Sequence, residues 1–134
     1  MSETIRIGIV GAGANTRSRH IPGLRAHKDV EIVAVCNQSI QSSERAAREL
    51  QIPRSFLTWP ELVASPGIDA VVIGTWPYLH CPVTLAALDA GKHVMTEARM
   101  AMNAAEARLM LEASGRKPHL VTQVVPSPYT LKID

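Results

Sequence analysis

Short runs of mostly apolar residues alternate along the chain with longer stretches in which apolar and polar residues mix. The runs are four to seven residues long and rich in Val and Ile, and most are apolar on both faces. This pattern is typical of strands in a parallel sheet that helices cover on both sides. The expected strands are Ile5–Val10, Val30–Cys36, a weaker one at Arg54–Leu57, Ala70–Gly74, Lys92–Thr96 and His119–Val124.

The stretches between these strands carry signals for helix starts and ends, mainly serine, asparagine, proline and glycine. Right-handed crossovers between successive strands then predict an α/β fold, a doubly wound parallel sheet of about six strands with helices on both faces. The expected helical segments are 16–27, interrupted by Pro22; a helix capped by Ser42 or Ser43 that runs to about Leu50; Glu61–Ala64 after Pro60; Val83–Ala90, ended by Gly91; and a helix from Asn103, with Glu106 in a capping box, to Gly115.

A glycine-rich turn follows the first expected strand and opens the first helical stretch. Gly11 permits a tight turn, and Gly13 allows a pyrophosphate to approach the backbone amides at the helix start. Thr16 takes the third position of the G-x-G-x-x-G/A pattern, so we expect the helix to pack further from the strand or to start later. The turn predicts dinucleotide binding in a Rossmann fold; a structural turn without a ligand is the alternative.

The end of the second strand bears on the choice between NAD and NADP. Asn37 stands where NAD-preferring folds place an acid, and it does not repel a 2′-phosphate. Ser39, Ser42, Ser43 and Arg45 follow at a helix start and offer donors to an anion. The sequence therefore favours NADP slightly over NAD, unless these serines only cap the helix.

Composition narrows the class of protein further. The chain has 14 Lys and Arg against 12 Asp and Glu, a net charge of +2, which argues against nucleic acid as a partner. No targeting segment is evident, and no apolar stretch approaches the ~20 residues of a membrane span. Two cysteines supply neither a metal site nor a disulfide framework, and fit a cytoplasmic setting.

In combination, these motifs resemble the N-terminal domain of the Gfo/Idh/MocA oxidoreductases. The resemblance is carried by IRIGIVGAGA, RHIPGL at 19–24, VEIVAVC, IDAVVIGT at 68–75, LAALDAGKHV at 85–94 and Glu97. It implies an NAD- or NADP-binding domain, 1–124, of an oxidoreductase for a sugar- or polyol-like substrate. A second domain would supply much of the substrate site, and 125–134 would be a linker or crossover toward it; a frayed tail is the alternative. A homodimer is a further expectation.

The resemblance also assigns residues to the coenzyme. The glycine turn would hold the pyrophosphate, the end of the second strand would face the adenosine ribose, and Trp76 and Tyr78 would cover the coenzyme. Trp76 packing under the second domain is the alternative reading. The expected cofactor-binding residues are Gly11, Gly13, Ala14, Asn15, Thr16, Asn37, Gln38, Ser39, Thr75, Trp76, Tyr78, His80 and Glu97.

The catalytic half of the family pattern is altered. Members typically show Glu-Lys-Pro where this chain has Glu97-Ala98-Arg99, and an alanine side chain has no proton to donate. His80 and Arg99 are the remaining catalytic candidates, although Arg99 is permanently charged. The chain is then a variant enzyme domain, a fragment, or a non-catalytic module that senses the coenzyme or binds a partner.

Overall fold

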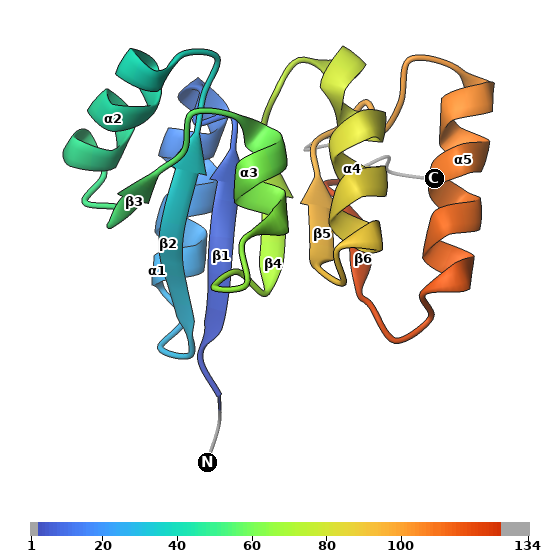
Figure 1. Cartoon of the computed structure of the whole chain (residues 1–134), viewed down its shortest axis with the longest axis horizontal. Helices are drawn as coiled ribbons and strands as arrows, with labels where there is room; N and C mark the ends of the chain where they lie inside the picture. Colours follow the sequence, from blue (N-terminus) through green and yellow to red (C-terminus); the bar gives the residue numbers. More distant parts are fainter. Residues whose placement is uncertain (1–2, 127–134) are drawn as a thin grey trace, which may run out of the picture.

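A computed structural model describes residues 3–126 of the chain. Its centre is a six-stranded sheet in the order β3-β2-β1-β4-β5-β6, in which every neighbouring pair is parallel (Figure 1). The strands are β1 (Ile5–Val10), β2 (Val30–Cys36), β3 (Arg54–Ser55), β4 (Ala70–Ile73), β5 (His93–Thr96) and β6 (Thr122–Val124). The expected doubly wound parallel sheet is therefore confirmed.

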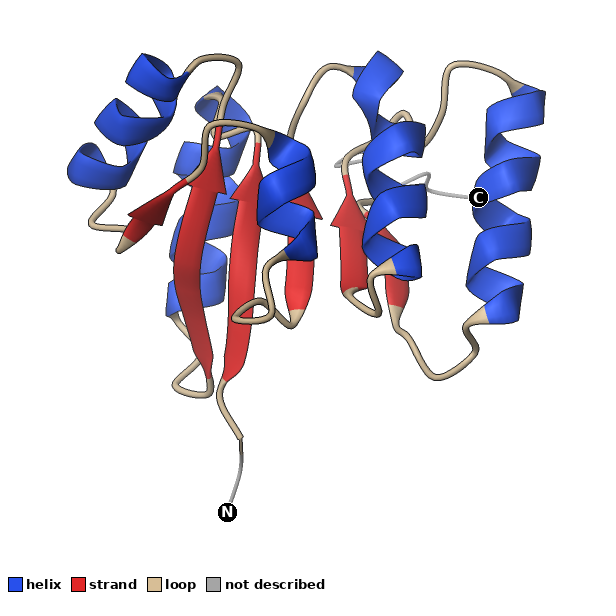
Figure 2. Ribbon diagram, in the orientation of Figure 1, coloured by secondary structure: helices blue, strands red, loops and turns tan. Residues whose placement is uncertain are grey.

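Helices cover both faces of the sheet, as expected (Figure 2). The helical segments are a π-helical turn, η1 (Thr16–His20), α1 (Ile21–Arg25), α2 (Ile40–Glu49), α3 (Trp59–Ala64), a 3-10 turn, η2 (Pro77–Leu79), α4 (His80–Asp89) and α5 (Ala104–Arg116). Among residues 3–126, none of these helices is long and apolar enough to cross a bilayer.

Two apolar cores lie on opposite faces of the sheet. On one face, Leu62 of α3, Val83 of α4 and Ala113 of α5 pack against alternate residues of β4 and β5. On the other, Ile21 of α1 and Ala46 of α2 pack against β1 and β2. Burial of both faces explains why the strands read as nearly continuous apolar runs.

Several helix starts differ from the sequence prediction. Ser39, not Ser42 or Ser43, caps α2: its backbone is extended and its Oγ accepts the amide of Ser42 at 3.1 Å. The helix α3 begins at Trp59 rather than Glu61, and α4 begins at His80 rather than Val83, so that Pro82 lies in its first turn. Proline is tolerated in a first helical turn because the backbone N–H that it lacks would have no intrahelical acceptor there.

The remaining differences are at strand and segment ends. Expected at His119, β6 begins only at Thr122, because the amide of Leu120 closes a turn on Lys117 and that of Val121 bonds to Nδ1 of His93. At the other end of β6, the amide of Val125 donates to the carbonyl of Thr96 and extends the β5–β6 pairing by one hydrogen bond. The rest of the expected linker, 127–134, lies outside the described residues.

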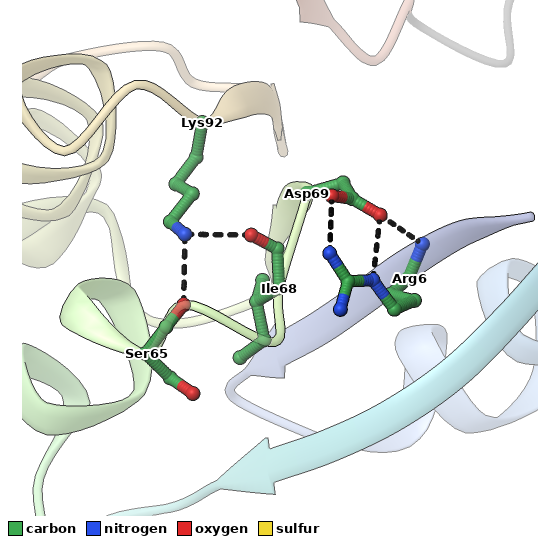
Figure 3. Close-up of polar contacts among 5 residues, drawn as sticks. All are labelled: Arg6, Ser65, Ile68, Asp69 and Lys92. Carbon is green, nitrogen blue, oxygen red and sulfur yellow. Dashed lines mark hydrogen bonds and ion pairs between the residues drawn. The ribbon is translucent and has the colours of Figure 1, made fainter. Parts of the chain in front are cut away.

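The edge of the sheet at which the strands begin is held by polar contacts (Figure 3). The guanidinium of Arg6 in β1 makes two hydrogen bonds to the carboxylate of Asp69, just before β4. These contacts hold β1 and the start of β4 together at the amino ends of the strands. They lie at the opposite edge of the sheet from the carboxyl ends, where ligands of such folds bind.

Candidate cofactor-binding site

A cleft of about 1130 Å³ opens at the edge where the strands end. It lies across β1, whose neighbours β2 and β4 connect in opposite directions along the sheet. Ligands of doubly wound folds bind at this switch point. The cleft is lined by 10–16, by 36–39 and Ser42, by 57–60, by 74–76 with Tyr78 and Leu79, and by Glu97 and Ala98.

Gly11 makes the turn that forms the floor of the cleft. Its φ is +88°, and a Cβ there would lie 2.8 Å from the carbonyl carbon of Gly74 and from the amide of Thr75. Both the backbone conformation and the close approach of the two loops therefore exclude any larger side chain. The expected tight turn is confirmed.

Gly13 differs, since a Cβ there would meet nothing within 4 Å. The helical residues begin at Ala14, directly after Gly13, which has no side chain to cap them, and residues 14–17 include no acid. The first amides of a helix have no intrahelical partner, and they attract an anion. The geometry fits the pyrophosphate of a dinucleotide.

Thr16 is accommodated in a way that the sequence did not indicate. The residue is buried, and its Oγ1 donates to the carbonyl of Gly11 at 3.2 Å. A Cβ on Gly74 would lie 2.2 Å from that Oγ1, so the missing side chain at the end of β4 makes room for it. The helix does not start later; instead it widens into the π-turn that begins at Thr16.

Asn37 ties the glycine turn to the start of α2. Its Oδ1 accepts the amide of Ala12 at 2.8 Å, and its Nδ2 donates to Oγ of Ser42 at 3.0 Å. Its own amide donates to Oγ of Ser43 at 2.7 Å. The expected ribose-facing residue therefore lines the cleft and also orders two of its walls.

The polar residues after Asn37 divide into two groups. Ser39 and Ser42 line the cleft, together with Gln38. Ser43 is fully buried and donates to the carbonyl of Ser39, so it offers nothing to an anion, which corrects the expectation. Arg45 is exposed on α2 and does not line the cleft.

One wall of the cleft was not expected from the sequence. It is formed beside the end of β2 by the end of the loop after β3 and by the first residues of α3: Leu57, Thr58, Trp59 and Pro60. The strand order contains the missing signal, because β3 pairs with β2 and its loop must open at the same edge. An apolar wall there suits a flat aromatic base.

The loop after β4 brings the two expected aromatic residues to the rim. Trp76 and Tyr78 line the cleft and are exposed to 69% and 52%. Thr75 also lines the cleft. More than half of each aromatic surface is thus free to cover a ligand or another part of the protein.

His80 and Arg99 do not line the cleft. His80 is fully buried, with Nδ1 2.6 Å from the carbonyl oxygen of Arg99 and Nε2 3.0 Å from that of Thr75. It therefore holds together the loops that follow β4 and β5. The residues that line the cleft at the end of β5 are Glu97 and Ala98.

Glu97 lies at the carboxyl end of β5 and faces the glycine turn. Its Oε1 accepts from Nδ2 of Asn15 at 2.6 Å and also contacts Nε2 of His20. His20 was not among the expected site residues. Of the thirteen expected cofactor residues, all but His80 line the cleft.

The glycine turn, the switch-point cleft and the sheet order define a dinucleotide-binding Rossmann domain. Residues 5–124 match the model of the oxidoreductase family with an NAD-binding Rossmann fold, GFO_IDH_MocA. The chain belongs to this family, as the resemblance in its sequence implied.

Two of the relatives are named for reactions of sugars. The chain is 38% identical over 109 residues to 1,5-anhydro-D-fructose reductase of Ensifer adhaerens, covering 81% of this chain and 32% of the relative. It is 34% identical to D-xylose 1-dehydrogenase (NADP(+)) of Hypocrea jecorina, covering 94% and 35%. The chain thus spans about a third of the length of these relatives.

Solved structures agree on the fold. An NAD binding oxidoreductase from Klebsiella pneumoniae matches with a TM-score of 0.85 at 30% identity, over 91% of this chain and 34% of the other. Biliverdin reductase from Synechocystis, in complex with biliverdin and NADP+, matches with a TM-score of 0.81 at 29% identity, over 90% and 37%.

Proposed function

We propose that the chain is the coenzyme-binding domain of an NAD(P)-dependent oxidoreductase that acts on a sugar- or polyol-like substrate. The observation that carries this proposal is the uncapped helix start behind Gly11 and Gly13, which opens on the cleft. The substrate class is supported by the sugar-converting relatives named above. The free, buried thiols of Cys36 and Cys81 support a cytoplasmic location.

When bound, the dinucleotide would supply hydride transfer, and the chain's own residues would hold and orient it. The glycine turn and the amides of 14–16 would bind the pyrophosphate. Asn37, Gln38 and Ser39 would face the adenosine ribose, and Thr75, Trp76 and Tyr78 would cover the other half. His80 would act as a positioning residue, because it fixes the loop that carries Thr75.

We further propose a preference for NADP over NAD. Among residues 3–126, no carboxylate lines the cleft near the end of β2, and α2 has no acidic residue in its first turn. A 2′-phosphate would therefore meet donors and a helix start rather than an acid.

Asn37→Asp tests this preference. The aspartate keeps an acceptor for the amide of Ala12 but adds a negative charge, so we expect NADPH affinity to fall about tenfold or more relative to NADH. Fluorescence titration with both coenzymes measures the ratio, and Glu44→Gln on the exposed face of α2 is the control. An unmodified chain that clearly prefers NADH contradicts the proposal.

Ala98 supports a second candidate function, a non-catalytic module that senses the coenzyme. This residue lines the cleft where related enzymes are expected to carry lysine. Restoring lysine at 98 in a protein that includes a second domain separates the two candidates. Gain of dehydrogenase activity would favour a degenerate enzyme, whereas coenzyme binding without activity in either form would favour a sensor.

The expected division of the chain, a domain at 1–124 and a linker from 125, is part of the same proposal. A second domain reached through that linker would bring the substrate to the rim formed by Trp76 and Tyr78. Limited proteolysis of a longer protein tests the boundary, since cleavage between the two domains is expected near 125–134.

A further inference from the structure

Glu97 has the only charged side chain among the described residues that line the cleft. Every other lining residue in the range 3–126 is apolar or neutral. A carboxylate among neutral lining residues contributes a negative electrostatic potential to the cleft, and the ring of His20 contacts it from outside the lining.

Contacts on one side hold this carboxylate in place. Asn15 donates to Oε1 at 2.6 Å, and the ring of His20 contacts the same oxygen. The side chains of Glu97 and His20 are only 18% and 11% exposed. The other oxygen, Oε2, has no hydrogen-bond partner within residues 3–126, so it is free to act on a ligand in the cleft.

The fold places Glu97 at one end of the expected ligand. In this fold the adenosine ribose lies at the end of β2, and the pyrophosphate lies on the helix start after β1. The nicotinamide then extends to the other side, toward the ends of β4 and β5. Glu97 directly follows β5, and its partner Asn15 lies two residues after Gly13.

We propose that Glu97 makes this cleft discriminate between the two redox states of the coenzyme and favour the oxidised one; this inference rests on the proposed function. The oxidised nicotinamide ring carries one positive charge and the reduced ring carries none. Both states contain the same pyrophosphate, so its repulsion by Glu97 cancels in the ratio of the two affinities. The attraction between the carboxylate and the ring does not cancel.

The size of the effect follows from Coulomb's law. Unit charges several ångströms apart in a partly solvated cleft interact strongly enough to change a ratio of affinities by about 3- to 30-fold. His20 and Asn15 both contact Oε1 of Glu97, so they fix the position of the carboxylate and leave Oε2 for the ligand.

The test measures the dissociation constants of NADP+ and NADPH, and of NAD+ and NADH, for the 134-residue chain by calorimetry. The ratio of the reduced to the oxidised constant is the readout. Glu97→Gln keeps an oxygen for Asn15 but removes the charge, so we expect the ratio to fall about 3- to 30-fold. Glu97→Asp keeps the charge and is expected to keep the ratio within about twofold.

Two further variants complete the test. Glu44→Gln removes a carboxylate from the exposed face of α2, on the adenosine side, and should leave the ratio unchanged. Ala98→Lys adds a cation to the exposed residue beside Glu97 and should lower the ratio; it decides the question if Glu97→Gln fails to fold. An unchanged ratio in Glu97→Gln or Ala98→Lys, with both coenzyme states still bound, overturns the inference. Failure of the unmodified chain to bind either state overturns the proposed function itself.

Discussion

Gly11 and Gly13 stand two residues apart in one turn, yet the structure restricts only Gly11. Gly11 has a positive φ and lies against the backbone of Gly74, so the fold itself requires glycine there. Gly13 has free space on the side where a Cβ would point. In the proposed function, the pyrophosphate approaches the backbone on that side.

Replacing each glycine by alanine should therefore separate folding from binding. Gly11→Ala should lower the free energy of unfolding by more than about 2 kcal/mol, because it adds a close backbone contact to an unfavourable φ. Gly13→Ala should leave stability within about 1 kcal/mol and weaken coenzyme binding at least about tenfold. Urea unfolding and coenzyme titration measure the two effects, with Gly115→Ala in α5 as the control. Equal loss of stability in both variants would contradict this reading.

At the scale of elements, the inner strands β1, β2, β4 and β5 were predictable, because burial on both faces makes them nearly continuous apolar runs. Helix starts were harder to predict, because they depend on which residue adopts the extended backbone of a cap, as Ser39 does before α2. The fit of Thr16 into the space beside Gly74 could not be predicted from the sequence, since it depends on how closely the start of η1 approaches the end of β4. The same holds for the contact of His20 with Glu97, which links η1 to the end of β5.

Lys92 shows how one buried cation joins elements. It lies directly before β5, is only 8% exposed, and donates from Nζ to the carbonyls of Ser65 and Ile68 at 2.7 and 2.6 Å (Figure 3). These carbonyls belong to the segment between α3 and β4. The ammonium thus ties that segment to the start of β5, and burial lowers its pKa from the usual lysine range, with Asp69 partly opposing the shift.

We expect Lys92→Met to destabilise the domain, because each carbonyl left without a partner costs about 1–3 kcal/mol. The lowered pKa also fixes the sign of a pH effect. The unfolded chain holds the proton more tightly, so the free energy of unfolding should rise as pH increases through the folded pKa, and the gain is complete above the usual lysine pKa. Urea unfolding between about pH 8 and 11 measures both effects, and Lys28→Met, at an exposed position, is the control. A variant with unchanged stability and the same pH slope as the unmodified chain would contradict this role.

At the scale of the whole molecule, the cleft is complete for a coenzyme and incomplete for a substrate. Residues from five loops surround the expected dinucleotide, whereas Trp76 and Tyr78 leave most or half of their surface exposed at the rim. The chain spans about a third of its relatives' length. Hydride transfer requires a substrate held in attack geometry, and a single open rim does not exclude water or fix that geometry.

The 134-residue chain alone should therefore bind coenzyme but show little or no turnover with sugars or polyols. Binding and catalysis separate here because the proposed pyrophosphate site lies within residues 11–16, whereas Ala98 supplies no acid or base beside the expected nicotinamide. Absorbance of the reduced coenzyme at saturating oxidised coenzyme measures turnover, and Gly13→Ala is the control for activity that depends on the cleft. Robust turnover by the unmodified chain, lost in Gly13→Ala, would mean that this domain alone can position a substrate. The catalytic proton would then have to pass through a group other than the missing lysine, and Glu97 with His20 would be the first pair to replace.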